Sequence, residues 1–196
     1  TTAGAGTESG AHTYNTHGDV LANNVASFSL TQLNWNPELH TAELAYDGKY
    51  RLFGEQDTTA SGGNESIIYT YNTYADLLNN NASSFAFTSI NWNPDIKTVG
   101  FEYDGDYLVM VEFKDTSWPA FSESHIYGYH TFEDLLADNW AYSLATPFDW
   151  PSDFHTSGIA YDGKYHLMGE RATTAGAGAE SFMTTFDSYG EFITNN

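Results

Sequence analysis

The chain repeats its own sequence, and this repetition constrains the fold more than any other feature. The opening residues Thr1-Thr2-Ala3-Gly4-Ala5-Gly6 and Glu8-Ser9 reappear as Thr173-Thr174-Ala175-Gly176-Ala177-Gly178 and Glu180-Ser181. Aligning the chain with itself gives units at residues 1–57, 58–115 and 116–172, followed by a partial unit at 173–196. Repeat units bury their apolar faces against their neighbours, so we expect one repeat domain over residues 1–196.

Each full unit carries an Asp-Gly hairpin at the same position. The turns are Asp47-Gly48, Asp104-Gly105 and Asp162-Gly163, and alternating aromatic and aliphatic residues flank them. This pattern predicts two antiparallel strands, which we call a and b, joined by a type I′ turn with positive φ at both central positions.

Two more strands and a short helix complete the unit. A loop follows strand b, and Glu-Ser then opens strand c, as in Glu65-Ser66. Strand c runs into a helix-start pattern, a Thr or Ser followed three residues later by Asp or Glu, whose hydroxyl can accept a free backbone N–H. The alternating stretches 28–31 and 85–88 predict a strand d with one buried face. The four helix starts are at Thr16, Thr73, Thr131 and Ser188.

These elements predict an all-β, β-propeller-like repeat protein. Each unit of about 57 residues would supply four antiparallel strands with a short helical turn after the third, which matches one propeller blade. A β-solenoid, a trefoil and a sandwich fit the unit length or the repetition less well. Closed propellers usually have four or more blades, and only three a–b hairpins are present. The array is therefore part of a larger ring, is completed by another chain, or closes in an unusual way.

Charge and composition limit the classes of partner that the chain can bind. The chain has 26 Asp and Glu against six Lys and Arg, a formal net charge of −20, and 41% hydrophobic residues. Such a surface would repel nucleic acid and anionic membranes, while the apolar content is enough for a globular core. No apolar run approaches the roughly 18 residues of a membrane span. The acidic, Lys-poor, Asn- and Thr-rich composition favours a secreted or cell-surface protein.

The hairpin and the strand after it resemble a known family. Tyr-Asp-Gly-Lys-Tyr-x-Leu-x-Gly, then a Gly/Thr/Ala loop, Glu-Ser, an aromatic strand and Tyr-x-Asp-Leu-Leu resemble blades of the five-bladed arabinofuranosidase and xylosidase glycoside hydrolases. The similarity covers residues 46–78, 103–136 and 161–192. It implies a propeller and a carbohydrate context. The three central carboxylates of those enzymes do not map onto this chain residue by residue, so it implies no active site.

Acidic residues recur at fixed positions and admit several roles. Glu55, Glu112 and Glu170 each end strand b. They could bond backbone N–H groups of the loop that follows, or could hold Ca²⁺, which takes six to eight oxygen ligands. Glu43 and Glu102 lie in strand a without counterparts in the other copies. Since glycoside hydrolysis needs two carboxylates in different environments, an enzyme would place its acid and base at departures of this kind.

A tryptophan beside Asn or Asp closes each unit and suggests a sugar site. Sugar C–H faces stack on indole rings while amide and carboxylate oxygens accept hydroxyl groups. The alternative is that these tryptophans pack between blades. Trp118 lies in the loop after strand b of its unit, where the other copies have small and polar residues. An apolar side chain in this loop suggests a contact with a ligand or another chain. The candidate ligand-binding residues are Trp35, Trp92, Trp150, Asn34, Asn91, Asp149 and Trp118.

The sequence therefore predicts a secreted, non-catalytic, lectin-like propeller that binds glycans at weak repeated sites and gains strength by multivalency. Two alternatives stay open: a five-bladed glycoside hydrolase type of enzyme, and an assembly protein whose redundant terminal strands pair with another chain. Both chain ends carry a strand c, so we expect an edge that needs a partner.

Overall fold

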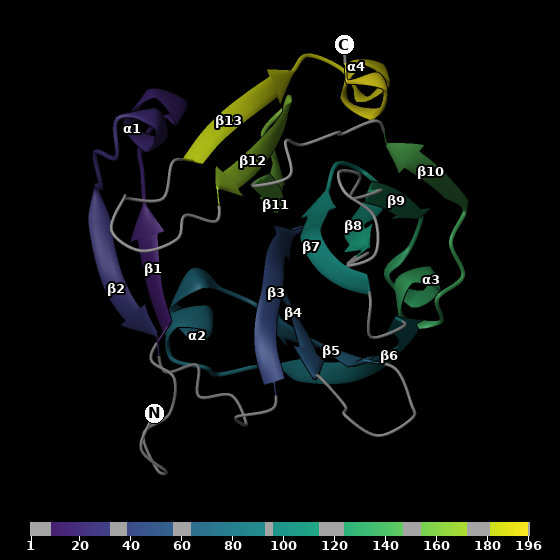
Figure 1. Cartoon of the computed structure of the whole chain (residues 1–196). Coiled ribbons are helices and arrows are strands. Elements are labelled where there is room, and N and C mark those ends of the chain that lie inside the picture. The colour runs from purple at the N-terminus through teal and green to yellow at the C-terminus, as the bar shows by residue number, and fades with distance from the viewer. Residues whose placement is uncertain are drawn as a thin grey trace.

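The computed structural model describes residues 9–31, 39–56, 64–92, 96–113, 124–146, 154–171 and 181–195, and strands make up most of them. The antiparallel sheets follow one another around a common centre, with strands β3, β7 and β11 innermost (Figure 1). Over the described residues the strands do not close into a barrel or a propeller ring. The expected all-β class with repeated antiparallel sheets is confirmed.

In the described part of the chain, one strand precedes the first helix, and four strands lie between each helix and the next. The strands are β1 (Ser9–Thr13), β2 (Ser27–Thr31), β3 (Leu39–Tyr46), β4 (Tyr50–Gln56), β5 (Asn64–Tyr71), β6 (Ser84–Trp92), β7 (Ile96–Tyr103), β8 (Tyr107–Phe113), β9 (Ser124–Tyr129), β10 (Tyr142–Thr146), β11 (Phe154–Tyr161), β12 (Tyr165–Arg171) and β13 (Ser181–Phe186). The helices are α1 (His17–Leu21), α2 (Tyr74–Leu78), α3 (Phe132–Leu136) and α4 (Tyr189–Thr194).

Three of the four sheets combine the end of one sequence unit with the start of the next, and the sheet β1-β2 comes from the first unit alone. Two sheets hold the full order a–b–c–d, as β3-β4-β5-β6 and β7-β8-β9-β10. The sheet β11-β12-β13 holds a, b and c, and the sheet β1-β2 holds c and d. The duplicated end segments therefore supply strand c to two different sheets, β1 to one and β13 to the other.

The a–b turns differ from the expected type. Tyr46 pairs with Tyr50, which leaves three residues in the loop rather than two. Within these turns, only the glycine has a positive φ, +97° at Gly48, +123° at Gly105 and +108° at Gly163. The type I′ prediction was wrong because the Asp side chain shapes this turn: the Asp47 carboxylate accepts the Lys49 N–H at 3.0 Å. The glycine is still required for its left-handed backbone.

All four predicted helix starts are confirmed as N-caps. In α2 the Thr73 hydroxyl accepts the Asp76 N–H at 3.1 Å and donates to the Asp76 carboxylate at 2.7 Å. The same pattern begins α1 and α3, and Ser188 caps α4. These five- and six-residue helices are too short to be stable alone, so the cap and the packing hold them.

Removing the cap hydroxyl should weaken this packing. We expect Thr73→Ala to lower the free energy of unfolding by about 1 kcal/mol, because the Asp76 N–H loses its acceptor. Urea denaturation measures the change, and Thr73→Ser, which keeps the hydroxyl, should stay close to the parent chain. An equal loss in both variants would contradict the capping role.

Among the described residues, two large apolar cores lie between consecutive sheets, beside a smaller cluster around Leu52, Tyr71 and Leu77. The first joins β3–β6 to β7–β10 and includes Phe53, Ile68, Phe101 and Val109, all fully buried. The second joins β7–β10 to β11–β13. Its buried members are Leu108, Met110, Ile126, Ile159, Tyr165, Leu167, Phe186 and Phe192. Packing between successive sheets is how a repeat array gains its stability.

The outer strands were expected to bury their apolar face, and this prediction was wrong. Phe85 and Phe87 of β6 are 61% and 65% exposed, whereas Ile90 of the same strand is buried. Phe28 and Leu30 of β2 are also exposed. The strand is the outermost of its sheet, so alternation alone does not decide which face meets the neighbouring sheet. Among the described residues, no helix is long and apolar enough to cross a membrane.

Candidate functional site

The innermost strands bring together the two acids that the repeat does not share. Strand β7 lies beside both β3 and β11. Glu43 comes from β3 and Glu102 from β7, and both reach toward β11. At the position of Glu43 the other copies have Gly100 and Gly158. The symmetry of the array is therefore broken at its centre.

Glu102 is a half-buried carboxylate with two backbone partners. Its Oε1 accepts the Tyr103 N–H at 2.7 Å, and its Oε2 accepts the Tyr161 N–H of β11 at 3.1 Å. It thus links β7 to β11. Burial raises the pKa of Glu102 to about 7, and the two N–H groups counteract part of this rise by favouring the ionised form.

Glu43 is also half-buried, and the hydrogen bond that it accepts is longer than those of Glu102. Its Oε1 accepts the Leu44 N–H at 3.4 Å. A Cβ added to Gly158 would lie 3.0 Å from its Oε2, so this glycine makes room for the carboxylate beside β11. Burial raises the pKa of Glu43 to about 8, and the nearby Glu102 charge adds to the rise. Both carboxyl groups therefore hold their protons more strongly than an exposed glutamate does.

Tyrosines of the hairpins, two of them exposed and one half-buried, lie at the ends of the innermost strands. Tyr46, Tyr103 and Tyr161 occupy one repeat position at the end of the innermost strands. Each ring lies 4.8 Å from the tyrosine that starts strand b of its own hairpin. Tyr46 is 55% exposed and Tyr161 36% exposed. Tyr103 and Tyr161 donate their backbone N–H groups to Glu102, so the backbone of two of these hairpins contacts this acid.

The arrangement combines hydrogen-bond acceptors with aromatic rings. An ionised Glu102 can accept two hydroxyl groups, and a protonated Glu43 can donate one. Exposed tyrosine rings offer flat apolar faces with a polar tip. Groups of these two kinds are those that recognise polyhydroxylated ligands with C–H faces in general. The sequence had singled out the acids, but not the tyrosines, whose fixed repeat position was the available signal.

Of the three strand-b acids, the structure describes the side chain of Glu55. It is fully buried, and its Oε1 accepts the Thr98 hydroxyl of β7. This bond joins two neighbouring sheets, which is a structural role. Glu112 and Glu170 lie in β8 and β12, but their side chains fall outside the described residues. Over the described part of the chain, no three His, Asp or Glu side chains are placed to hold a metal ion, and the Ca²⁺ site stays a prediction.

The predicted tryptophan sites fall outside what the structure describes. Trp35, Trp118, Trp150, Asn34 and Asp149 lie in segments that are not described, and Asn91 and Trp92 are described only as backbone of β6. The sugar platforms at these positions therefore remain predictions.

No family model, no curated protein and no solved structure matches the chain. The resemblance to five-bladed glycoside hydrolases thus remains an expectation from the hairpin sequence. Any function rests on the site itself.

Proposed function

We propose that the chain is an open, propeller-like repeat protein that binds carbohydrate where its innermost strands end. The observation that carries the proposal is the pair of half-buried carboxylates, Glu43 and Glu102, of which Glu102 accepts the backbone N–H groups of two hairpin tyrosines, Tyr103 and Tyr161. Acceptors of hydroxyl groups next to aromatic faces are the chemistry that recognises sugars. The tryptophan sites expected from the sequence would add weaker contacts and multivalency.

Neutral and acidic glycans serve as the probes. A glycan array should identify a ligand, and calorimetry should then give its affinity. We expect Glu102→Gln to weaken binding at least tenfold, because one charged hydrogen bond to a ligand contributes about 1.5–3 kcal/mol. Tyr161→Ala, which removes an exposed ring but keeps the backbone donor to Glu102, should weaken it several-fold.

A matched control separates binding from general charge effects. Glu133 is an exposed acid in the first turn of α3, so Glu133→Gln removes the same charge elsewhere. This variant should bind as the parent chain does. Failure of the parent chain to bind any glycan would refute the proposal, and so would normal binding by both site variants.

The unequal hydrogen bonding of the two acids, one long N–H bond to Glu43 and two N–H bonds to Glu102, favours a second candidate, a glycoside hydrolase activity of the same pair. Glu43, with a pKa of about 8, would donate a proton to the leaving oxygen. Glu102, held by two N–H groups, would act as the ionised base or nucleophile. Aryl arabinosides and xylosides test this activity directly. Release of the aryl group that either Glu43→Gln or Glu102→Gln lowers by about 100-fold or more would support it; no turnover would leave binding as the function.

A further inference from the structure

Each innermost strand has a register shift, typical of a β-bulge, at the same repeat position. In the three hairpins the pairing of strand a with strand b skips one residue of strand a. The skip lies between Thr41 and Glu43 in β3, between Thr98 and Gly100 in β7, and between Thr156 and Gly158 in β11. A bulge bends its strand and re-aims the side chain beside it. The position after the bulge thus holds a carboxylate in one copy and a glycine in the other two.

The two glycines at this position are needed for space, not for backbone conformation. The described glycines with a positive φ are those of the three hairpin turns, so an alanine could adopt the backbone at Gly100 and Gly158. A Cβ on Gly100 would lie 2.8 Å from the Ile159 side chain, and a Cβ on Gly158 would lie 3.0 Å from the Glu43 carboxylate. Both distances are shorter than a van der Waals contact. Each glycine therefore makes room for a side chain of another sheet.

The contact between Gly158 and Glu43 joins the third innermost strand to the first. Glu43 projects from β3, where it pairs with Phe53 of β4, and its Oε2 reaches Gly158 of β11. From β7 the Glu102 charge acts on it. Gly158 is buried, so a carboxyl group that lies against it is shielded from water on that side. The Leu44 N–H bond to Oε1, at 3.4 Å, is too long to fix the group firmly, so its place depends on the room beside Gly158.

We infer that Gly158 is a positioning residue of the central site: by having no side chain, it lets the Glu43 carboxyl group lie against β11. It acts through Glu43 and not through a contact of its own with a ligand. The inference rests on the proposed function, in which Glu43 is one of the two sugar-binding acids. It adds that β11 positions both of them, Glu102 through the Tyr161 N–H and Glu43 through the absence of a Cβ.

Titration of Glu43 in Gly158→Ala tests the inference without any ligand. The added methyl group should turn the carboxyl group away from β11 and toward water, so its pKa should fall from about 8 toward the ordinary value of 4.5. NMR of isotope-labelled glutamate side chains measures this change, and Glu43→Gln identifies the signal. We expect a fall of about one pH unit or more. A pKa that stays at the parent value, or rises, would overturn the inference, because the carboxyl group would then not have moved.

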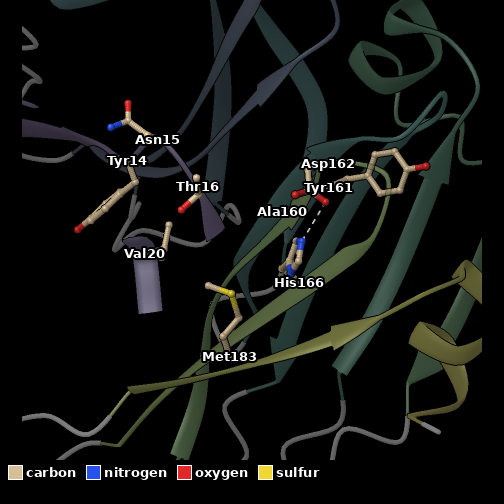
Figure 2. Close-up of a pocket in the computed structure, with 9 residues that line it drawn as sticks. All are labelled: Tyr14, Asn15, Thr16, Val20, Ala160, Tyr161, Asp162, His166 and Met183. Carbon is tan, nitrogen blue, oxygen red and sulfur yellow. Dashed lines mark hydrogen bonds and ion pairs between the residues drawn. The ribbon is translucent and has the colours of Figure 1, made fainter. Parts of the chain in front are cut away.

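A matched change two residues along β11 separates this effect from a general disturbance of the strand. Ala160 lies on the same face of β11 as Gly158, and it lines a pocket of about 450 Å³ (Figure 2). Ala160→Ser adds one heavy atom at this exposed position, as Gly158→Ala does at the buried one. In the Ala160→Ser chain, Glu43 should titrate as it does in the parent chain. A fall in the Glu43 pKa equal to that of Gly158→Ala would contradict a role particular to Gly158.

Removal of the carboxyl group provides a second test, based on stability. Gly158→Ala should lower the thermal midpoint of the chain, because its Cβ lies too close to Glu43. In a Glu43→Ala background the same change should lower the midpoint little, since the opposing group is gone. If Gly158→Ala alone does not fold, adding Glu43→Ala should restore folding. Equal losses in the two backgrounds, or no restoration, would overturn the inference.

Glycan binding separates the inference from the proposed function. With a ligand from the array, Gly158→Ala should weaken binding about as much as Glu43→Gln does, and the two changes together should weaken it little more. Normal binding by Gly158→Ala beside weak binding by Glu43→Gln would contradict the positioning role. If the parent chain binds no glycan, the proposed function fails, whereas the titration and the thermal midpoints still decide for or against Gly158.

Discussion

Replacing Phe101 with alanine should lower the free energy of unfolding by about 3–5 kcal/mol. Phe101 is fully buried on the innermost strand β7, with its ring centroid 5.5 Å from that of Phe53 and 6.2 Å from that of Tyr107. It joins the sheet β3–β6 to its neighbour, so its loss opens a cavity at the junction. Urea denaturation followed by tryptophan fluorescence measures the change.

An exposed phenylalanine provides the control for this change. Phe85 of β6 is 61% exposed, and its ring contacts those of Tyr69 and the similarly exposed Phe87, so Phe85→Ala should cost less than about 1 kcal/mol. Similar losses for the two variants would mean that the sheets do not pack as the structure describes.

The stability of the chain should fall as the pH rises from about 5 to about 8. Glu43 has a pKa of about 8 in the folded protein against 4.5 as the ordinary value, so the folded state binds more protons in this range. Stability then decreases with pH, in contrast to an acid whose pKa is lowered by folding. We expect a decrease on the order of 2–4 kcal/mol, since one pKa unit corresponds to about 1.4 kcal/mol and Glu43 is not wholly shielded.

Neutral glutamine at this position should remove much of that pH dependence. Glu43→Gln should be more stable than the parent chain at pH 8 and should differ little from it at pH 5. Glu133→Gln controls for the general charge repulsion in a chain with net charge −20. In this variant the free energy of unfolding should depend on pH as it does in the parent chain. Denaturant unfolding at several pH values measures this dependence. If the free energy of unfolding falls with pH equally steeply in Glu43→Gln and in the parent chain, a raised pKa of Glu43 in the folded protein is refuted.

Local patterns predicted the elements well. The Thr-x-x-Asp helix starts were identified because each cap forms within four residues, and Thr73 and Asp76 bond as the pattern requires. Strand positions followed from the repeated hairpins. The turn type was missed because Asp47 bonds its own loop and shifts the pairing to Tyr46 and Tyr50.

Longer-range features required the structure. Alternation in β6 does not say which face is covered, and Phe85 is exposed because its strand is outermost. The sequence marked Glu43 and Glu102 as departures from the repeat. It could not reveal that both reach β11, because that contact depends on how three sheets meet.

Chemical-shift mapping of a bound glycan tests the central proposal most directly. With the best ligand from the array, backbone amide shifts should change most at Tyr103, Tyr161 and Leu44, whose N–H groups bond the central acids. The changes should vanish in Glu102→Gln. Changes confined to the segments around Trp35, Trp92 and Trp150, with the amides of Tyr103 and Tyr161 unaffected, would contradict a sugar site at the innermost strands.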